Sequence, residues 1–135
     1  MIEKSALFCL GALGYGCIEL VWRGRTHWTM LLAGGVCMLA LWALNERLAR
    51  WPLLARCAAG ALVITGVELA FGVVCNLLLG WRVWDYSLLW GNLWGQICPL
   101  YSSLWFLLCV PIFGSLSLCR ARLDAPAAPG GGQEG

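Results

Sequence analysis

The sequence predicts an all-α membrane protein, a bundle of four transmembrane helices with both termini in the cytoplasm. Its 135 residues have a mean hydropathy of +0.77, and only 12% of them are charged. That share is about half of the value for a typical soluble domain. Four apolar stretches approach or reach the roughly 20 residues that cross a bilayer as a helix. These stretches are residues 5–22, 28–44, 57–79 and 97–119. They are continuous, whereas the strands of a membrane barrel would alternate in hydropathy.

The first stretch is interpreted as a retained helix rather than a signal peptide. Lys4 precedes it, but Glu19 and Trp22 stand where a cleavage site requires small residues. One transmembrane domain is therefore expected over residues 1–119. The Pro/Gly/Ala-rich residues 120–135 are expected to form a disordered cytoplasmic tail.

Basic residues predict the orientation of the four spans. An even number of spans places both termini on the same side as the second connection. Six basic residues lie on that side: Lys4, Arg47, Arg50, Arg56, Arg120 and Arg122. Three lie on the other side: Arg23, Arg25 and Arg82. The excess places both termini in the cytoplasm, with Cys119 on that side and Cys98 at the outer interface.

Two carboxylates inside the apolar stretches are the sharpest candidates for a functional site. Glu68 lies near the middle of the third stretch, where an ionised carboxylate costs several kcal/mol. We therefore expect Glu68 to be protonated and hydrogen-bonded to another helix. Glu19 lies four residues before Arg23, a spacing that lets the two pair on one helix face. Asn76 continues the polar stripe of Glu68. These residues are interpreted as proton, cation or substrate contacts, or alternatively as interhelical hydrogen bonds that fix the packing.

The segment WRVWDYSLLWGNLWGQIC, residues 81–98, joins the third and fourth stretches on the outer side. Its tryptophans suit the interface because indole is apolar but carries an N–H. Asp85 is expected to pair with Arg82. The other polar candidates in the segment are Trp84, Tyr86, Ser87, Asn92 and Gln96. The segment is interpreted as an outer lid over a cavity that contains Glu68, or alternatively as a plain interfacial loop.

Small residues predict close helix contacts, because they let two backbones approach. The candidates are Ala12, Gly16, Gly34, Gly35, Gly60, Ala61 and Gly66.

Several classes of function are disfavoured by the composition. The eight cysteines are scattered without a CxxC pair, and His27 is the single histidine, so no metal or cofactor site is expected. Lys4 is the single lysine, which excludes a GxxxxGK[ST] phosphate loop, so the chain is not itself a P-loop ATPase. The net charge of +2 is too small to indicate binding of nucleic acid.

Four strings of the sequence resemble a known family. They are GYGCIELVWRGRTHWTMLLAGG, ITGVELAFGVVCN, VWDYSLLWGNLWGQIC and YSSLW. Together they resemble the bacterial membrane family called putative ABC-transporter type IV, to which animal transmembrane protein 229 is similar. The family pattern has a proline before its asparagine, and this chain has Gly91 before Asn92. The matching positions are Glu19, Arg23, Gly24, Glu68, Asn76, Trp84, Asp85, Tyr86, Ser87, Asn92, Gly95 and Gln96.

The resemblance implies a multi-pass protein of the bacterial plasma membrane, with no established catalytic residue or substrate. We expect a permease-like transport subunit in the lipid bilayer that acts as a homo-oligomer or with a separate ATPase subunit. The alternative is an accessory or scaffold protein without a transport role. An intramembrane enzyme that uses Glu68 and Asp85 as an acid/base pair ranks third, since no nucleophile or metal set accompanies them. We therefore expect a protein that is not an enzyme.

Overall fold

The structure is a computed structural model that describes residues 3–126 and consists of four long helices. They are α1 (Lys4–Arg23), α2 (Trp28–Arg47), α3 (Leu53–Gly72) and α4 (Pro99–Asp124), with α3 continuing directly into the π-helix η1 (Val73–Leu78). Each of the four spans is long and apolar enough to cross a membrane. Residues 3–126 contain no β-strand, only an isolated bridge between Leu93 and Ile97. The predicted all-α class with four candidate membrane helices is confirmed.

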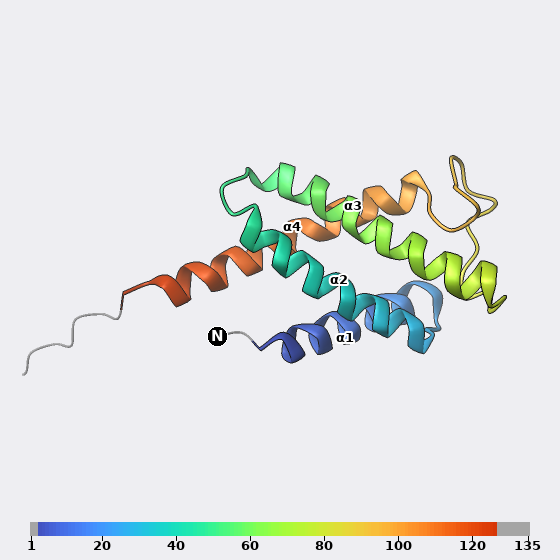
Figure 1. The fold of residues 1–135 in the computed structure, drawn as a ribbon, viewed down its shortest axis with the longest axis horizontal. Helices are drawn as coiled ribbons and strands as arrows, with labels where there is room; N and C mark the ends of the chain where they lie inside the picture. Colours follow the sequence, from blue (N-terminus) through green and yellow to red (C-terminus); the bar gives the residue numbers. More distant parts are fainter. Residues whose placement is uncertain (1–2, 127–135) are drawn as a thin grey trace, which may run out of the picture.

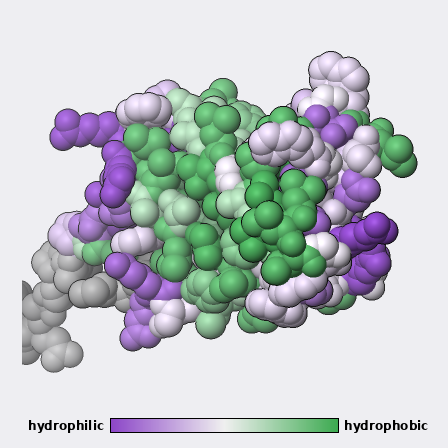
Figure 2. Space-filling model, turned by 45° about the vertical axis from the view of Figure 1, so that its right-hand side comes forward, coloured by the Kyte–Doolittle hydropathy of each residue, from purple (hydrophilic) through white to green (hydrophobic). Residues whose placement is uncertain are grey.

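The helices run between two ends of the molecule, and different segments of the chain lie at each end (Figure 1). The terminal end holds the start of α1, the connection 48–52 and the end of α4. The loop end holds the connection 24–27 and the long segment 79–98. A broad hydrophobic belt separates hydrophilic groups at the two ends (Figure 2). This distribution fits a bilayer around the middle of the bundle.

Helix α4 is longer than the sequence predicts. It continues through residues 120–124, which were expected to belong to the disordered tail, so that boundary is wrong. Arg120 stabilises the extra turn, because its guanidinium lies 3.4 Å from Glu46 of α2 and 3.7 Å from Asp124 one turn later. The rest of the expected tail, residues 127–135, lies outside the described residues.

Glycine lets α1 and α2 approach each other closely. A Cβ atom added to Gly34 would lie 2.5 Å from the Tyr15 Cβ and 2.6 Å from the Gly11 carbonyl oxygen. Gly60 of α3 is similarly close to side chains of α4. The prediction of close contact is therefore confirmed at Gly34 and Gly60. It is wrong at Gly66, which faces open space because it lies on the outer face of α3.

The bundle is open on one side. α3 packs against α4 and α2, and α1 packs against α2. Within residues 3–126, no Cα atom of α1 comes within 8 Å of a Cα atom of α4. Figure 1 shows α1 on the side of α2 that faces away from α3. The backbones of α1 and α4 therefore leave space between the two helices.

Candidate functional site

Glu68 is buried within the bundle, with 5% of its surface exposed. Its Oε1 accepts a hydrogen bond from the Tyr86 hydroxyl at 2.8 Å. Its Oε2 accepts one from Trp105 Nε1, on α4, at 3.0 Å. The expected hydrogen bond to another helix is therefore present. No Lys, Arg or His nitrogen of the described chain lies within 4.0 Å of this carboxyl group.

The two donors allow Glu68 to be either charged or neutral. The indole N–H of Trp105 can only donate, whereas a tyrosine hydroxyl both donates and accepts. A neutral Glu68 can donate its proton to the Tyr86 oxygen across the same 2.8 Å contact. A proton can thus bind or leave without dismantling the hydrogen bonds. The protonation of Glu68 near neutral pH stays a prediction.

The two donors to Glu68 belong to a set of four neighbouring aromatic rings, and we call Tyr15, Tyr86, Tyr101 and Trp105 the aromatic cluster. Tyr86 stacks on Tyr101 with ring centroids 4.4 Å apart and an interplanar angle of 8°. Trp105 lies 5.8 Å from Tyr15 and 6.2 Å from Tyr101, both at tilted angles. The cluster combines α1, α4 and the long loop, so the site depends on the whole tertiary fold.

Glu19 and Arg23 form the ion pair that their spacing predicts. Arg23 Nε donates to Glu19 Oε2 at 2.9 Å, and the neighbouring Nη2 donates to the same oxygen. Arg23 Nη1 also donates to the carbonyl oxygen of Val83 at 3.1 Å. The pair is thereby neutral as a unit and attaches the end of α1 to the long loop.

The long loop is held at its base by Asn76, which lies in the π-helix η1. Asn76 Nδ2 donates to Gln96 Oε1 at 2.8 Å, and Asn76 Oδ1 accepts from the Val83 backbone N–H at 2.7 Å. Trp84 Nε1 donates to the Gln96 carbonyl oxygen at 3.0 Å. Short π-helical segments are rare in proteins overall, and those that occur are often found at functional sites. Asn76, Trp84 and Gln96 therefore fix the loop over the Glu68 site.

Asp85 and Ser87 belong to the outer part of the same loop. Asp85 Oδ1 accepts the Ser87 N–H at 2.8 Å, and this backbone hydrogen bond lowers the pKa of the Asp85 carboxyl group. Asn92 donates to the Ser87 carbonyl oxygen at 3.1 Å and accepts from the Gly95 N–H at 3.0 Å. Gly95 has a φ of +70°. The expected Arg82–Asp85 ion pair is wrong, because the carboxylate instead caps its own turn.

A groove between α1 and α4 reaches the aromatic cluster. Its section at the loop end has a volume of about 310 Å³ and includes Glu19, Arg23, Tyr86 and Tyr101 in its wall. Its apolar section extends toward the terminal end and has a volume of about 530 Å³. The sections share four wall residues, Tyr15, Ile18, Trp105 and Leu108. Neither Glu68 nor Asp85 is part of either wall, so the groove does not bring the two together as an acid/base pair, and Glu68 is reached only through Tyr86 and Trp105.

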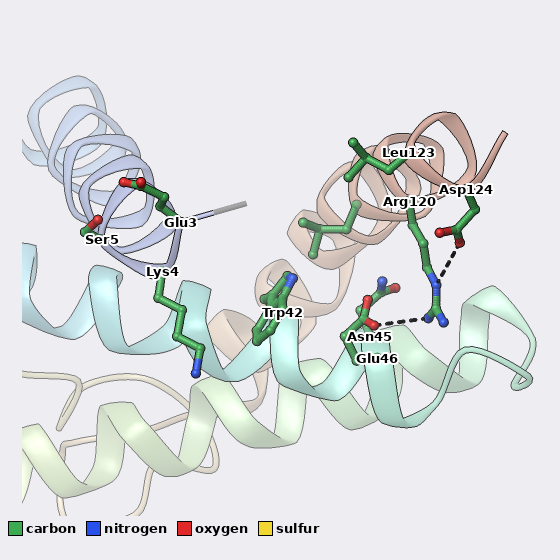
Figure 3. Close-up of a pocket in the computed structure, with 10 residues that line it drawn as sticks. Glu3, Lys4, Ser5, Trp42, Asn45, Glu46, Arg120, Leu123 and Asp124 are labelled. Atoms are coloured by element: carbon green, nitrogen blue, oxygen red, sulfur yellow. Dashed lines mark ion pairs between the residues drawn. The ribbon is translucent and has the colours of Figure 1, made fainter. Parts of the chain in front are cut away.

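A second polar region lies at the terminal end, away from Glu68. A pocket of about 680 Å³ is lined by both charge signs, including Lys4, Glu46 and Arg120 (Figure 3). Beside it, Arg56 Nη1 donates to Asn45 Oδ1 and to Ser117 Oγ, each at 2.8 Å. This network was not predicted from the sequence, although Asn45 directly follows an apolar stretch. In the described part of the chain, no three His, Cys, Asp or Glu side chains gather as a metal site would require.

The fold and site define a multi-pass helical membrane protein with a polar centre inside its bundle. The family described as "putative ABC-transporter type IV" matches residues 6–122, and the chain belongs to this family. The resemblance in the four sequence strings is thereby confirmed. No curated protein and no solved structure matches the chain. The family description names a class of transporter and no substrate.

Proposed function

We propose that the chain is a permease-like subunit of a transport assembly in the bacterial plasma membrane. The observation that carries the proposal is Glu68, a buried carboxyl group that has two hydrogen-bond donors but no cationic partner among residues 3–126. Buried ionisable groups in membrane helices are expensive, and they commonly mark the path of an ion or substrate. The groove between α1 and α4 leads to the rings that hold this group.

The energy for transport comes from a separate ATPase subunit. The chain has no phosphate-binding loop of its own, since its single lysine is Lys4. Four helices enclose little volume, so the subunit works as a homo-oligomer or beside other membrane subunits. Membership of a transporter family supports this arrangement.

Both termini lie in the cytoplasm in this proposal, supported by the six-to-three distribution of basic residues. Cys98 is at the loop end as expected, but it is 3% exposed and is a poor target for a reagent. Leu88, which is 99% exposed, is the better position. Two chains are compared, each with a single cysteine. The cysteine of Leu88→Cys should react with an impermeant thiol reagent on whole cells, and Cys119 should react only after lysis. The opposite pattern would reverse the orientation.

The second candidate is a scaffold or accessory protein. It is favoured by the complete internal pairing of Asn76 with Gln96 and of Glu19 with Arg23. Groups of this kind can serve packing alone. A scaffold should lose its assembly in Glu68→Leu, whereas a transport subunit should keep the assembly in Glu68→Gln and lose activity.

Purification in mild detergent with a tag on the full chain separates the two candidates. A transport subunit should bring an ATPase subunit with it in a fixed ratio, and the assembly should hydrolyse ATP in lipid vesicles. Glu68→Gln should keep the assembly but lower ATP hydrolysis, and Glu46→Gln, an acid at the terminal end, should change neither. An oligomer without an ATPase subunit, which keeps its assembly in Glu68→Gln and loses it in Glu68→Leu, would favour the scaffold instead.

A further inference from the structure

We propose that the groove between α1 and α4 binds a hydrophobic monovalent cation, such as a quaternary ammonium or phosphonium ion, against the aromatic cluster. This inference rests on the proposed function and names the class of ligand for the same site. Three features support it: the aromatic walls of the groove, the charges around the groove, and the apolar section through which a lipid-soluble ligand can enter.

The aromatic walls come from three parts of the chain. Tyr15 of α1, Tyr86 of the long loop, and Tyr101 and Trp105 of α4 all line the 310 Å³ section. Aromatic faces attract cations through the ring quadrupole, and cages of such rings are a common way to bind quaternary ammonium groups. A cation with a hydrophobic surface needs no hydration shell there, so it can lie directly against the ring faces.

The balance of charge favours a positive ligand. Arg23 is neutralised by Glu19 through two hydrogen bonds to one oxygen and is further held by Val83. Glu68 has no such partner within the described residues, and it lies one hydrogen bond behind Tyr86 and Trp105. A buried charge needs compensation, from a proton or from a cation. A cation in the groove would supply it across the rings.

The route of access suits a ligand that dissolves in lipid. α1 and α4 are linked at the loop end by a hydrogen bond from Trp22 Nε1 to the Tyr101 hydroxyl at 3.2 Å. Below this bond the wall becomes apolar over the 530 Å³ section, with Leu108 and Ile112 on the α4 side. The hydrophobic body of the cation can lie in this section, while its charge stays near the aromatic cluster.

Tetraphenylphosphonium and tetraphenylborate test the proposal, because they have the same shape and opposite charges. Equilibrium dialysis with the purified full chain should show saturable binding of the phosphonium ion and none of the borate ion. Glu68→Gln should weaken phosphonium binding about tenfold, because the negative charge behind the rings is lost. Glu46→Gln should leave the binding unchanged.

Tyr101 separates the role of the ring from that of its hydroxyl group. Tyr101→Leu should weaken phosphonium binding about tenfold, whereas Tyr101→Phe should retain it, because the ring face makes the contact. Circular dichroism of each variant checks that it is folded. Equal binding of both ions, or binding that Glu68→Gln and Tyr101→Leu leave unchanged, would overturn the cation class. ATP hydrolysis by the assembly is measured separately, so this result is distinguishable from failure of the permease proposal.

Discussion

Replacement of Glu68 should destabilise the bundle in proportion to the hydrogen bonds that the new side chain loses. In Glu68→Leu, the Tyr86 hydroxyl and the Trp105 N–H lose their acceptor. An orphaned buried donor costs about 1–3 kcal/mol, while hydrogen bonds between membrane helices average about 0.6 kcal/mol. Two lost bonds cost about 1 kcal/mol at that average, and two orphaned donors cost about 2 kcal/mol or more. Since Tyr86 is only half-buried and can bond water instead, we expect Glu68→Leu to lower the free energy of unfolding by about 1–3 kcal/mol.

Glu68→Gln should lower the free energy of unfolding by less than about 1 kcal/mol. Its amide oxygen can accept from Trp105, and its amide nitrogen can donate to the Tyr86 oxygen. Unfolding in mixed micelles of rising dodecyl sulfate content, followed by far-UV circular dichroism, measures both values.

Trp105→Phe provides the matched test of the same reasoning. Alone it should destabilise the chain by about 1 kcal/mol, because one oxygen of Glu68 loses its donor. In the Glu68→Leu background it should cost less, because it then removes an N–H that is already orphaned. Fully additive losses, or a Glu68→Leu chain as stable as the wild type, would refute the view that this carboxyl group holds α4 and the loop.

Three further predictions follow from contacts elsewhere in the structure. Gly34→Val should destabilise the α1–α2 contact by about 1–3 kcal/mol, because its Cβ would lie 2.6 Å from a backbone oxygen of α1. Gly66 faces open space, so Gly66→Ala is the control in the same unfolding assay. Glu19→Arg and Arg23→Glu should each lower the yield of folded protein. The double swap should recover the yield only in part, because the link from Arg23 to the loop is not restored. No recovery in the double swap would show that the two residues do not act as a pair. The Asp85 carboxylate should stabilise the loop fully at pH values above the ordinary aspartate pKa of about 4. This contribution should be lost as the pH falls through the lowered pKa of Asp85 in the folded state. Tryptophan fluorescence should show the transition, and Asp85→Asn should lack it.

The sequence predicted the features that follow from hydropathy and from spacing along one helix. Four apolar stretches became four helices because the composition leaves few alternatives in a bilayer. The Glu19–Arg23 pair followed from the i to i+4 spacing. Glu68 was predicted as a candidate site residue because it lies near the middle of an apolar stretch.

The partners across the bundle could not be predicted in the same way. Trp105 looks like any lipid-facing aromatic residue in its stretch, and only the packing of α3 on α4 turns its N–H toward Glu68. Asn76 lies in a π-helical turn and donates to Gln96, twenty residues later, a partner that the local sequence does not indicate. Asp85 was assigned the wrong partner because a backbone N–H two residues away competes better than an exposed arginine.

The infrared spectrum of the Glu68 carboxyl group tests the central claim most directly. The wild-type chain should show a protonated-carboxyl band at neutral pH, and Glu68→Gln should lack it. Addition of tetraphenylphosphonium should reduce this band, since the cation replaces the proton as the partner of the carboxylate, and tetraphenylborate should leave it unchanged. A spectrum in which neither the substitution nor the cation changes any carboxyl band would contradict the assignment of Glu68 as a proton and cation site.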